Sequence, residues 1–155
     1  GAPPDSPDLV ALQIWDSRML LAASPEYLER RGTPVRVEQL SEHDGICMDG
    51  WAPNALKSVT GERGSVRVQM KNRVRSNSLT TARNAALDGL GIAPLMKLTC
   101  QADLDSGALV EVLKGALPMS AKGWAVYPVA RERSAAAKAL IDHLARGARA
   151  AGIGT

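Results

Sequence analysis

The sequence predicts an α/β fold, in which helices pack against a sheet, and three observations support this class. Candidate strands alternate with candidate helices through most of the 155 residues, which favours α/β over an all-α or all-β plan. Residues 79–95 combine a helix-like apolar period, two glycines and a short apolar run, the order of a helix, its end and a buried strand. The composition, 45% hydrophobic and 23% charged, is that of a globular domain. With three Trp, two Tyr and no Phe, the core must be aliphatic.

The first part of the chain predicts a loop and two strands. Residues 1–7 contain three prolines and an Asp-Ser-Pro turn, which are typical of a loop. Residues 9–15 alternate loosely between apolar and polar side chains, and residues 19–23 are continuously apolar, so each is a strand candidate. The polar triplet Asp-Ser-Arg at 16–18 separates them. We therefore expect two strands here.

A helix is expected to follow immediately. Ser24 has the residue type of an N-cap, Pro25 suits the first helical position, and Glu26 places an acid in the first turn. Gly32 is expected to end this helix. The next segments are predicted as a turn with a short helix (33–44), a short strand (45–48) and a loop within a strand pair (51–64).

The segment SVRVQMKNRVRS, residues 65–76, has the clearest strand pattern. Its apolar face carries Val66, Val68, Met70 and Val74, and its polar face carries Arg67, Gln69, Lys71, Arg73 and Arg75. Four cations on one face are compatible with an anion, a phosphate backbone or an acidic partner. We favour a solvated edge strand, whose charges discourage pairing with another edge.

The most informative unit begins at three short polar residues. Ser76, Asn77 and Ser78 precede a helical pattern that starts at Leu79, and any of the three can serve as N-cap. Apolar residues then recur at helical spacing up to residue 90. Gly89 or Gly91 can adopt positive φ to end the helix, and residues 92–95 read as a short buried strand.

The remaining elements continue the alternation. They are a helical turn (102–104), a turn (106–107), a strand (109–113), a strand (123–129) and a helix that begins after Ser134. In this last helix Ala137, Leu140, Ile141 and Leu144 recur at helical spacing. It is the longest helix that the pattern predicts.

The charge and the cysteine content of the chain argue against several classes of protein. The net charge of +3 and pI near 9.1 are only mildly basic, without the concentrated basic patch of a polyanion binder. Cys47 and Cys100 lie far apart and have no second thiol or histidine beside them, so neither a zinc site nor a disulfide framework is expected. No stretch approaches the roughly 20 apolar residues that span a bilayer, so we expect a chain outside the membrane, in a reducing compartment.

No catalytic constellation is expected. His43 and His143 are isolated from each other in the sequence and suit surface or packing roles better than that of a general base. The segment GERGS, residues 61–65, lacks the lysine and the length of a phosphate-binding loop. We therefore expect no enzyme activity, no cofactor and no metal.

Five segments, taken in order, resemble the C-terminal part of the effector-binding domain of LysR-type transcriptional regulators. They are MLLAASPEYLERRGTP, EQLSEHDGICM, RSNSLTTARNAALDGLGIAPL, DLDSGALVEVL and WAVYPVARERSAAAKALIDHL. Each is weak alone, but their order and spacing cover nearly the whole chain. Leu140 and His143 stand where the family often has aromatic residues, which alters packing rather than role.

The resemblance implies a type II periplasmic-binding-protein-like fold of two α/β subdomains with a small effector between them. Residues 18–122 would form the complete second subdomain, and residues 1–17 and 123–155 would be fragments of the first with the crossover strands. Gly1 would fall partway through the domain, so the winged helix-turn-helix, the linker helix and the first elements of the effector domain would lie outside this chain. The apolar faces of residues 9–15 and of the last helix would then need another copy, or the absent portion, to cover them.

The resemblance also suggests where the effector binds. The helix after Ser78 would direct its free N–H groups and positive end at the cleft, which suits a carboxylate or another anionic metabolite. The expected effector-binding residues are Ser76, Asn77, Ser78 and Thr80, followed by Ser24 and Pro25 at the other capped helix. We expect both capped ends to face one crevice; for each residue, simple capping is the alternative.

The implied partners are a small-molecule effector and a second copy of the chain, in the cytoplasm. DNA would be contacted only through the absent helix-turn-helix, and no membrane contact is expected. The effector would shift the populations of two arrangements of the subdomains. A solute-binding protein of the same fold that serves transport is the alternative, and an enzyme on a similar scaffold lacks the necessary acid, base and nucleophile.

Overall fold

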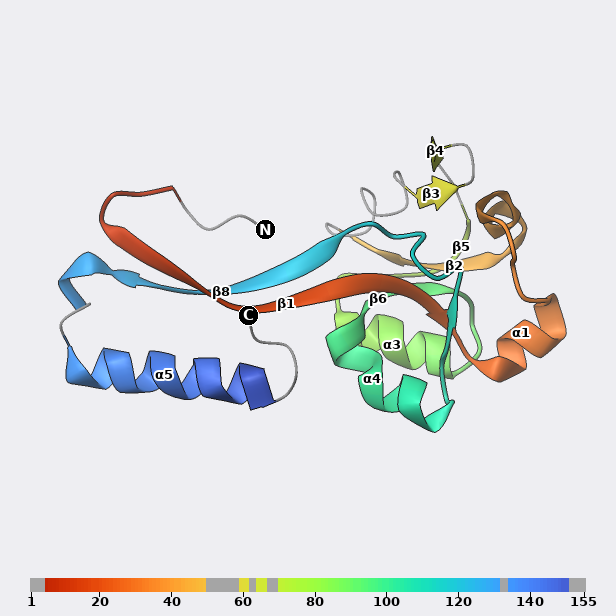
Figure 1. Cartoon of the computed structure of the whole chain (residues 1–155). Coiled ribbons are helices and arrows are strands. Elements are labelled where there is room, and N and C mark those ends of the chain that lie inside the picture. Colours follow the sequence, from red (N-terminus) through yellow and green to blue (C-terminus); the bar gives the residue numbers. More distant parts are fainter. Residues whose placement is uncertain (1–4, 50–58, 62–63, 67–69, 132–133, 151–155) are drawn as a thin grey trace. The chain divides into compact units, whose positions relative to one another are not determined.

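The computed structural model describes residues 5–49, 59–61, 64–66, 70–131 and 134–150 (Figure 1). The chain divides into two compact units. We call Gly1–Ser17 together with Ser120–Thr155 unit 1, and Arg18–Met119 unit 2. Strand β1 (Leu9–Ala23) contributes its first part to unit 1 and its second part to unit 2.

Unit 1 is a two-stranded ribbon covered on one face by a helix. Strand β8 (Ser120–Pro128) pairs with β1, and the 3-10 turn η3 (Val129–Arg131) follows it. Helix α5 (Ala135–Ala150) runs beside the ribbon in Figure 1. The Ser134 oxygen caps this helix by accepting from the Ala137 N–H at 3.5 Å, as predicted.

An open groove of about 460 Å³ separates α5 from the ribbon. Ile14 and Trp15 line it from β1, and Leu144 and Ala148 line it from α5. The expectation that these two apolar faces have no partner within the chain is therefore wrong in part, because each faces the other. Leu144 remains 43% exposed and Leu140, also on α5, 59% exposed.

Strand β1 is a single strand of 15 residues, so the prediction of two separate strands is wrong. The two charged residues between the expected strands each have a partner of opposite charge nearby. Asp16 lies 4.0 Å from Lys122, and Arg18 binds both carboxylate oxygens of Glu111 at 2.6 and 2.7 Å. Because these partners accommodate the polar side chains, the strand continues through them.

The strands of unit 2 pair in both antiparallel and parallel fashion. The second part of β1 lies between β6 (Ala93–Met96) and β7 (Val110–Val112), and both pair with it antiparallel. Strands β2 (Asp44–Met48) and β5 (Lys71–Ser76) pair in parallel. A parallel bridge between Gly45 and Ile92 joins β2 to the start of β6. Strands β3 (Val59–Gly61) and β4 (Gly64–Val66) form a separate hairpin.

The first helix has the predicted ends. Helix α1 covers Pro25–Arg31, Ser24 is its N-cap, and Gly32 follows it with φ of 83°. The Ser24 oxygen accepts a hydrogen bond from the Tyr27 N–H at 3.3 Å. A 3-10 helix, η1 (Val37–Glu42), then leads to β2, close to the short helix that the sequence predicts.

Two helices pack beside the sheet of unit 2 and complete its core. Helix α3 covers Leu79–Leu87 and helix α4 covers Lys97–Ser106, which is longer than the predicted single turn. The core contains aliphatic side chains and one thiol: Leu20, Ala22, Ile46, Met48, Ala82, Ala85, Ala86, Ala93, Leu95, Cys100 and Leu109. This cluster has no aromatic member, as the composition predicts, and the buried Tyr27 lies outside it.

The glycines after α3 allow a close approach of two chain segments. Gly89 has φ of 68° and Gly91 has φ of 159°. A Cβ atom on Gly91 would lie 2.5 Å from the carbonyl oxygen of Asp44, which accepts the Ile92 N–H at 2.9 Å. The glycine at this position therefore lets β6 begin directly beside β2.

The predicted strand 65–76 is interrupted in the structure. Its ends belong to β4 and β5, and residues 67–69, with Arg67, lie outside the described part. The pairing of β5 with β2 shifts register so that Gly45 faces Asn72 but Ile46 faces Val74, which leaves Arg73 as an extra residue. A strict two-residue alternation therefore fails here. Lys71, Arg73 and Arg75 are exposed.

Candidate functional site

The N-terminal end of α3 is the most developed polar site among the residues predicted for binding. Ser78 is the N-cap, with φ of −110° and ψ of 122°, and its side-chain oxygen accepts the Thr81 N–H at 3.4 Å. Its carbonyl oxygen accepts the Ala82 N–H at 3.0 Å. Ser76 supports this cap, because its hydroxyl oxygen accepts the Ser78 N–H at 3.0 Å. The predicted cap is confirmed at Ser78.

Two backbone donors at this end remain available. The first N–H groups of a helix have no partner within the helix, and a cap satisfies only part of them. Within the part of the chain that the structure describes, no hydrogen bond is formed by the N–H of Leu79 or of Thr80. Together with the positive end of the helix dipole, this pair of N–H groups favours an anion.

Strand ends meet at the same place. Met48, at the end of β2, pairs with Ser76, at the end of β5, and the Asp49 N–H donates to the Ser76 carbonyl at 2.8 Å. Asp49 also forms a 2.6 Å ion pair with Arg75, which neutralises its charge beside the site. The hydrogen bond to Asp49 raises the pKa of the Arg75 guanidinium above its ordinary value.

The four predicted residues of this segment differ in exposure. Ser76 and Ser78 are half-buried, whereas Asn77 and Thr80 are exposed. The structure therefore brings Ser76, Asn77, Ser78 and Thr80 together at one end of α3, with two hydroxyls occupied in the cap. The side chains of Asn77 and Thr80 have no hydrogen-bond partner among the described residues.

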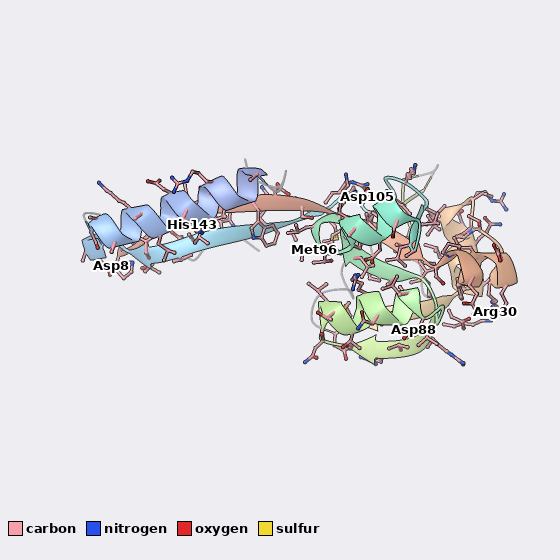
Figure 2. The ribbon with its side chains drawn as sticks, turned by 90° about the horizontal axis from the view of Figure 1, so that it is seen from below. Asp8, Arg30, Asp88, Met96, Asp105 and His143 are labelled. Carbon is pink, nitrogen blue, oxygen red and sulfur yellow. The ribbon has the colours of Figure 1, made fainter. Side chains whose placement is uncertain are left out.

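Ser24 and Pro25 do not join this group, so the expectation that both capped ends face one crevice is wrong. The Ser24 hydroxyl lies 3.4 Å from the point where a Cβ on Gly89 would stand, beside the C-terminal end of α3. Helix α3 has nine residues and is about 13 Å long, so Ser24 and Ser78 lie at opposite ends of it. Figure 2 shows Asp88, at the end of α3, on the side toward α1 and its Arg30.

The antiparallel pairing of β1 with β6 explains this separation. Ala22 pairs with Ala93 at the start of β6, and Met19 pairs with Met96 at its end. The C-terminal end of β1, which leads to Ser24, therefore lies at the edge where the parallel strands begin. Ser24 is only 4% exposed and is occupied by its capping bond. The cap residues in the sequence therefore identify where both helices begin along the chain, but not at which edge of the sheet each beginning lies.

Other charged contacts of unit 2 are structural and were not predicted. Arg83 of α3 binds both carboxylate oxygens of Asp103 of α4 at 2.5 Å, and Asp103 is 7% exposed. The sequence holds no local signal for such a pair, since its members are 20 residues apart. Hydrogen bonding to Arg18 lowers the pKa of Glu111, in a second pair of this kind.

The cysteines and histidines form no cluster. Burial raises the pKa of the Cys100 thiol to about 11, and burial also raises that of Cys47, whose Sγ donates to the Asn72 Oδ1 at 2.6 Å. His43 is buried and His143 is exposed. Among the described residues, no group of three or more His, Cys, Asp or Glu side chains could hold a metal ion. A search of the same residues finds no helix with the length and apolar character needed to cross a bilayer.

Comparisons with known proteins identify the family. The model of the LysR substrate binding domain matches residues 1–149. The HTH-type transcriptional regulator PgrR of Escherichia coli (strain K12) is 30% identical over 141 residues, which are 88% of this chain and 47% of PgrR. CrgA of Neisseria meningitidis serogroup C (strain 8013), also an HTH-type transcriptional regulator, is 32% identical over 111 residues, 70% of this chain and 36% of CrgA. The chain thus spans less than half the length of these curated relatives.

A solved structure shows the same fold. The regulatory domain of CrgA, a LysR-type transcriptional regulator from Neisseria meningitidis, superposes with a TM-score of 0.83 at 24% sequence identity. The superposition covers 94% of this chain and 72% of that structure. This confirms the predicted type II periplasmic-binding-protein-like α/β fold. With the family model matched over almost the entire chain, we conclude that the chain belongs to the family of LysR substrate binding domains.

Proposed function

We propose that this chain is the effector-sensing domain of a LysR-type transcriptional regulator. Its family and the HTH-type regulators among its relatives support this function over transport. Units 1 and 2 would correspond to the two effector subdomains, with the boundary near residues 17 and 120. DNA binding would reside in the helix-turn-helix part of such a regulator, which would act in the cytoplasm as a homo-oligomer.

The effector in this proposal is a small anionic metabolite, and the end of α3 carries the argument. The free N–H groups of Leu79 and Thr80 are a preformed donor pair at a positive helix end. The exposed side chains of Asn77 and Thr80 add polar contacts, and Ser76 and Ser78 hold the segment in place. Ser24 and Pro25 are left out of the proposed site because they lie at the other end of α3.

The output would be a shift of populations rather than a chemical step. An effector with unequal affinity for two arrangements of the subdomains favours the arrangement that it binds better. The size of the shift is limited by that difference in affinity, so a ligand that binds both equally has no effect. No covalent chemistry is assigned to any residue of the chain.

Thermal unfolding with matched pairs of charged and neutral ligands tests whether the effector must be an anion. We use benzoate and succinate as aromatic and aliphatic carboxylates, with benzamide and succinamide as their neutral counterparts. A ligand that binds only the folded chain stabilises it by about 2.7 kcal/mol at one hundred times its Kd. A rise in Tm with a carboxylate, but not with its amide, supports the proposal. Equal rises with acid and amide would contradict the anionic effector.

Thr80→Val tests whether the end of α3 is the place of binding. Thr80 is exposed and its side chain does not cap the helix, so the change should leave the ligand-free Tm almost unchanged. Losing one hydroxyl contact of about 1 kcal/mol weakens carboxylate binding roughly fivefold. Thr33→Val is the matched control, because Thr33 is exposed and follows α1, whose N-cap Ser24 lies at the other end of α3. Equal weakening in both variants would place the binding site elsewhere.

A further inference from the structure

A histidine is enclosed where α1, η1 and β2 meet in unit 2. His43 lies between η1 and β2 and is 6% exposed, and Tyr27 of α1 is fully buried beside it. The two ring centroids are 5.9 Å apart, with the planes tilted by 53°. The Tyr27 hydroxyl oxygen lies 3.2 Å from His43 Nδ1.

The hydrogen bonds of the Tyr27 hydroxyl favour one protonation state of His43. The Asp44 N–H donates to the Tyr27 oxygen at 2.9 Å, so this oxygen already acts as an acceptor. Its single proton is then free to be donated, and Nδ1 of His43 is the acceptor within reach. We assign this direction to the bond, which leaves Nδ1 without a proton and makes the ring neutral, with its proton on Nε2. A second proton would enter at Nδ1, directly against the tyrosine oxygen.

The surrounding charges do not favour a cationic ring. Burial lowers the pKa of His43 below its ordinary value, and Arg31 of α1 lowers it further, while Glu42 of η1 and Asp44 of β2 oppose them. Arg31 lies 3.8 Å from the Asp44 carboxylate, so the negative charge of Asp44 is already paired, and it donates to the backbone carbonyl oxygen of Glu42 at 2.9 Å.

Within the described residues, the neighbouring strands β3 and β5 add one cation and no acid beside His43. From β5, the Lys71 N–H donates to the His43 carbonyl oxygen at 3.0 Å, and its side chain is exposed. Strand β3, which contacts η1, has the sequence Val-Thr-Gly and carries no titratable side chain. The junction therefore holds a neutral histidine more readily than a charged one.

We propose that protonation of His43 opens the junction between α1 and β2, so that unit 2 carries a built-in response to acidification. In the closed junction, as assigned, Nδ1 accepts the tyrosine proton, whereas a charged ring presents an N–H to the same oxygen and turns the tyrosine proton away. The tyrosine proton then loses its acceptor, and the bond that holds the start of β2 to α1 is weakened.

The sign of the pH dependence follows from the lowered pKa. In the open junction His43 titrates near the ordinary value of about 6.5. The closed junction has its full stability above that pH and loses stability as the pH falls toward the lower pKa of the closed state. Because one proton is taken up, the opening equilibrium increases by at most tenfold per pH unit.

Hydrogen exchange of the Asp44 amide, measured by NMR on the whole chain between pH 7.5 and 5.5, tests the proposal. We expect the protection factor of this amide to fall by up to tenfold per pH unit below about pH 6.5. The Ala82 amide in α3, which bonds to the Ser78 carbonyl, serves as the reference and should change little. Equal changes at both amides, or none at Asp44, would overturn the proposal.

Two variants and a direct titration complete the test. His43→Asn keeps an acceptor near the Tyr27 hydroxyl but cannot take up a proton, so the pH dependence at Asp44 should disappear. His143→Asn removes the other histidine, which is exposed on α5, and should leave the dependence intact. If His43→Asn does not fold, the proposal is tested by titrating the histidine ring signals of the unmodified chain by NMR. His43 titrating below the ordinary histidine value of about 6.5 supports the proposal, and His43 titrating at or above that value overturns it.

Discussion

At the scale of single residues, unit 1 depends on one very close contact. A Cβ atom on Gly123 of β8 would lie 2.2 Å from Cε2 and Nε1 of the Trp15 indole. No side chain fits between that ring and the strand, so the glycine allows the tryptophan to pack directly on the backbone. The same contact places Trp15 at the groove beneath α5.

Gly123→Ala should therefore displace Trp15 and destabilise unit 1. Forcing one extra carbon into a packed contact typically costs about 1–3 kcal/mol. Gly147→Ala is the control, because a Cβ there meets no atom within 4 Å and the residue lies inside α5, where Ala stabilises a helix by up to about 1 kcal/mol over Gly. Urea denaturation followed by tryptophan fluorescence compares the two. A Gly123→Ala chain as stable as the unmodified one would contradict the packing described.

At the scale of elements, α3 depends on its N-cap. The Ser78 oxygen satisfies the Thr81 N–H, and Ser76 fixes the Ser78 backbone. Loss of a serine cap costs about 1 kcal/mol, whereas asparagine caps a helix nearly as well as serine. Ser78 therefore belongs both to the cap and to the proposed anion site, but it has a different role in each.

Ser78→Ala and Ser78→Asn separate these demands. We expect Ser78→Ala to lower the free energy of unfolding by about 1 kcal/mol and Ser78→Asn to change it by much less. Far-UV circular dichroism in increasing urea measures both. An alanine variant as stable as the asparagine variant would show that the cap contributes nothing to α3.

Several elements could be predicted because their signals are local. Ser24, Pro25 and Gly32 mark α1, and Ser78 with Gly89 marks α3, since caps and positive φ angles depend on a few neighbouring residues. Sequence patterns failed to predict structure where contacts with residues far along the chain determine it. The continuation of β1 depends on partners about a hundred residues away, and the extra residue in β5 depends on its register against β2.

At the scale of the whole molecule, chain direction within the sheet determines which caps gather. The sequence identifies two capped helices, but their pairing partners decide where those caps lie. Because β1 is antiparallel to β6, Ser24 lies at the edge opposite Ser78. The part of the candidate site formed by residues 76–80 could be predicted because it is one contiguous segment. The part that required two distant segments to meet could not.

The proposed sensor function depends on the backbone donors at the start of α3. The most direct measurement follows the amide signals of Leu79 and Thr80 by NMR while the carboxylate that raises Tm most is added. We predict saturable shifts of both signals, at the same Kd that the thermal data give, and a Kd about five times larger in Thr80→Val. Saturable binding that leaves both amides unmoved, with the shifts confined to residues elsewhere in the chain, would contradict the account.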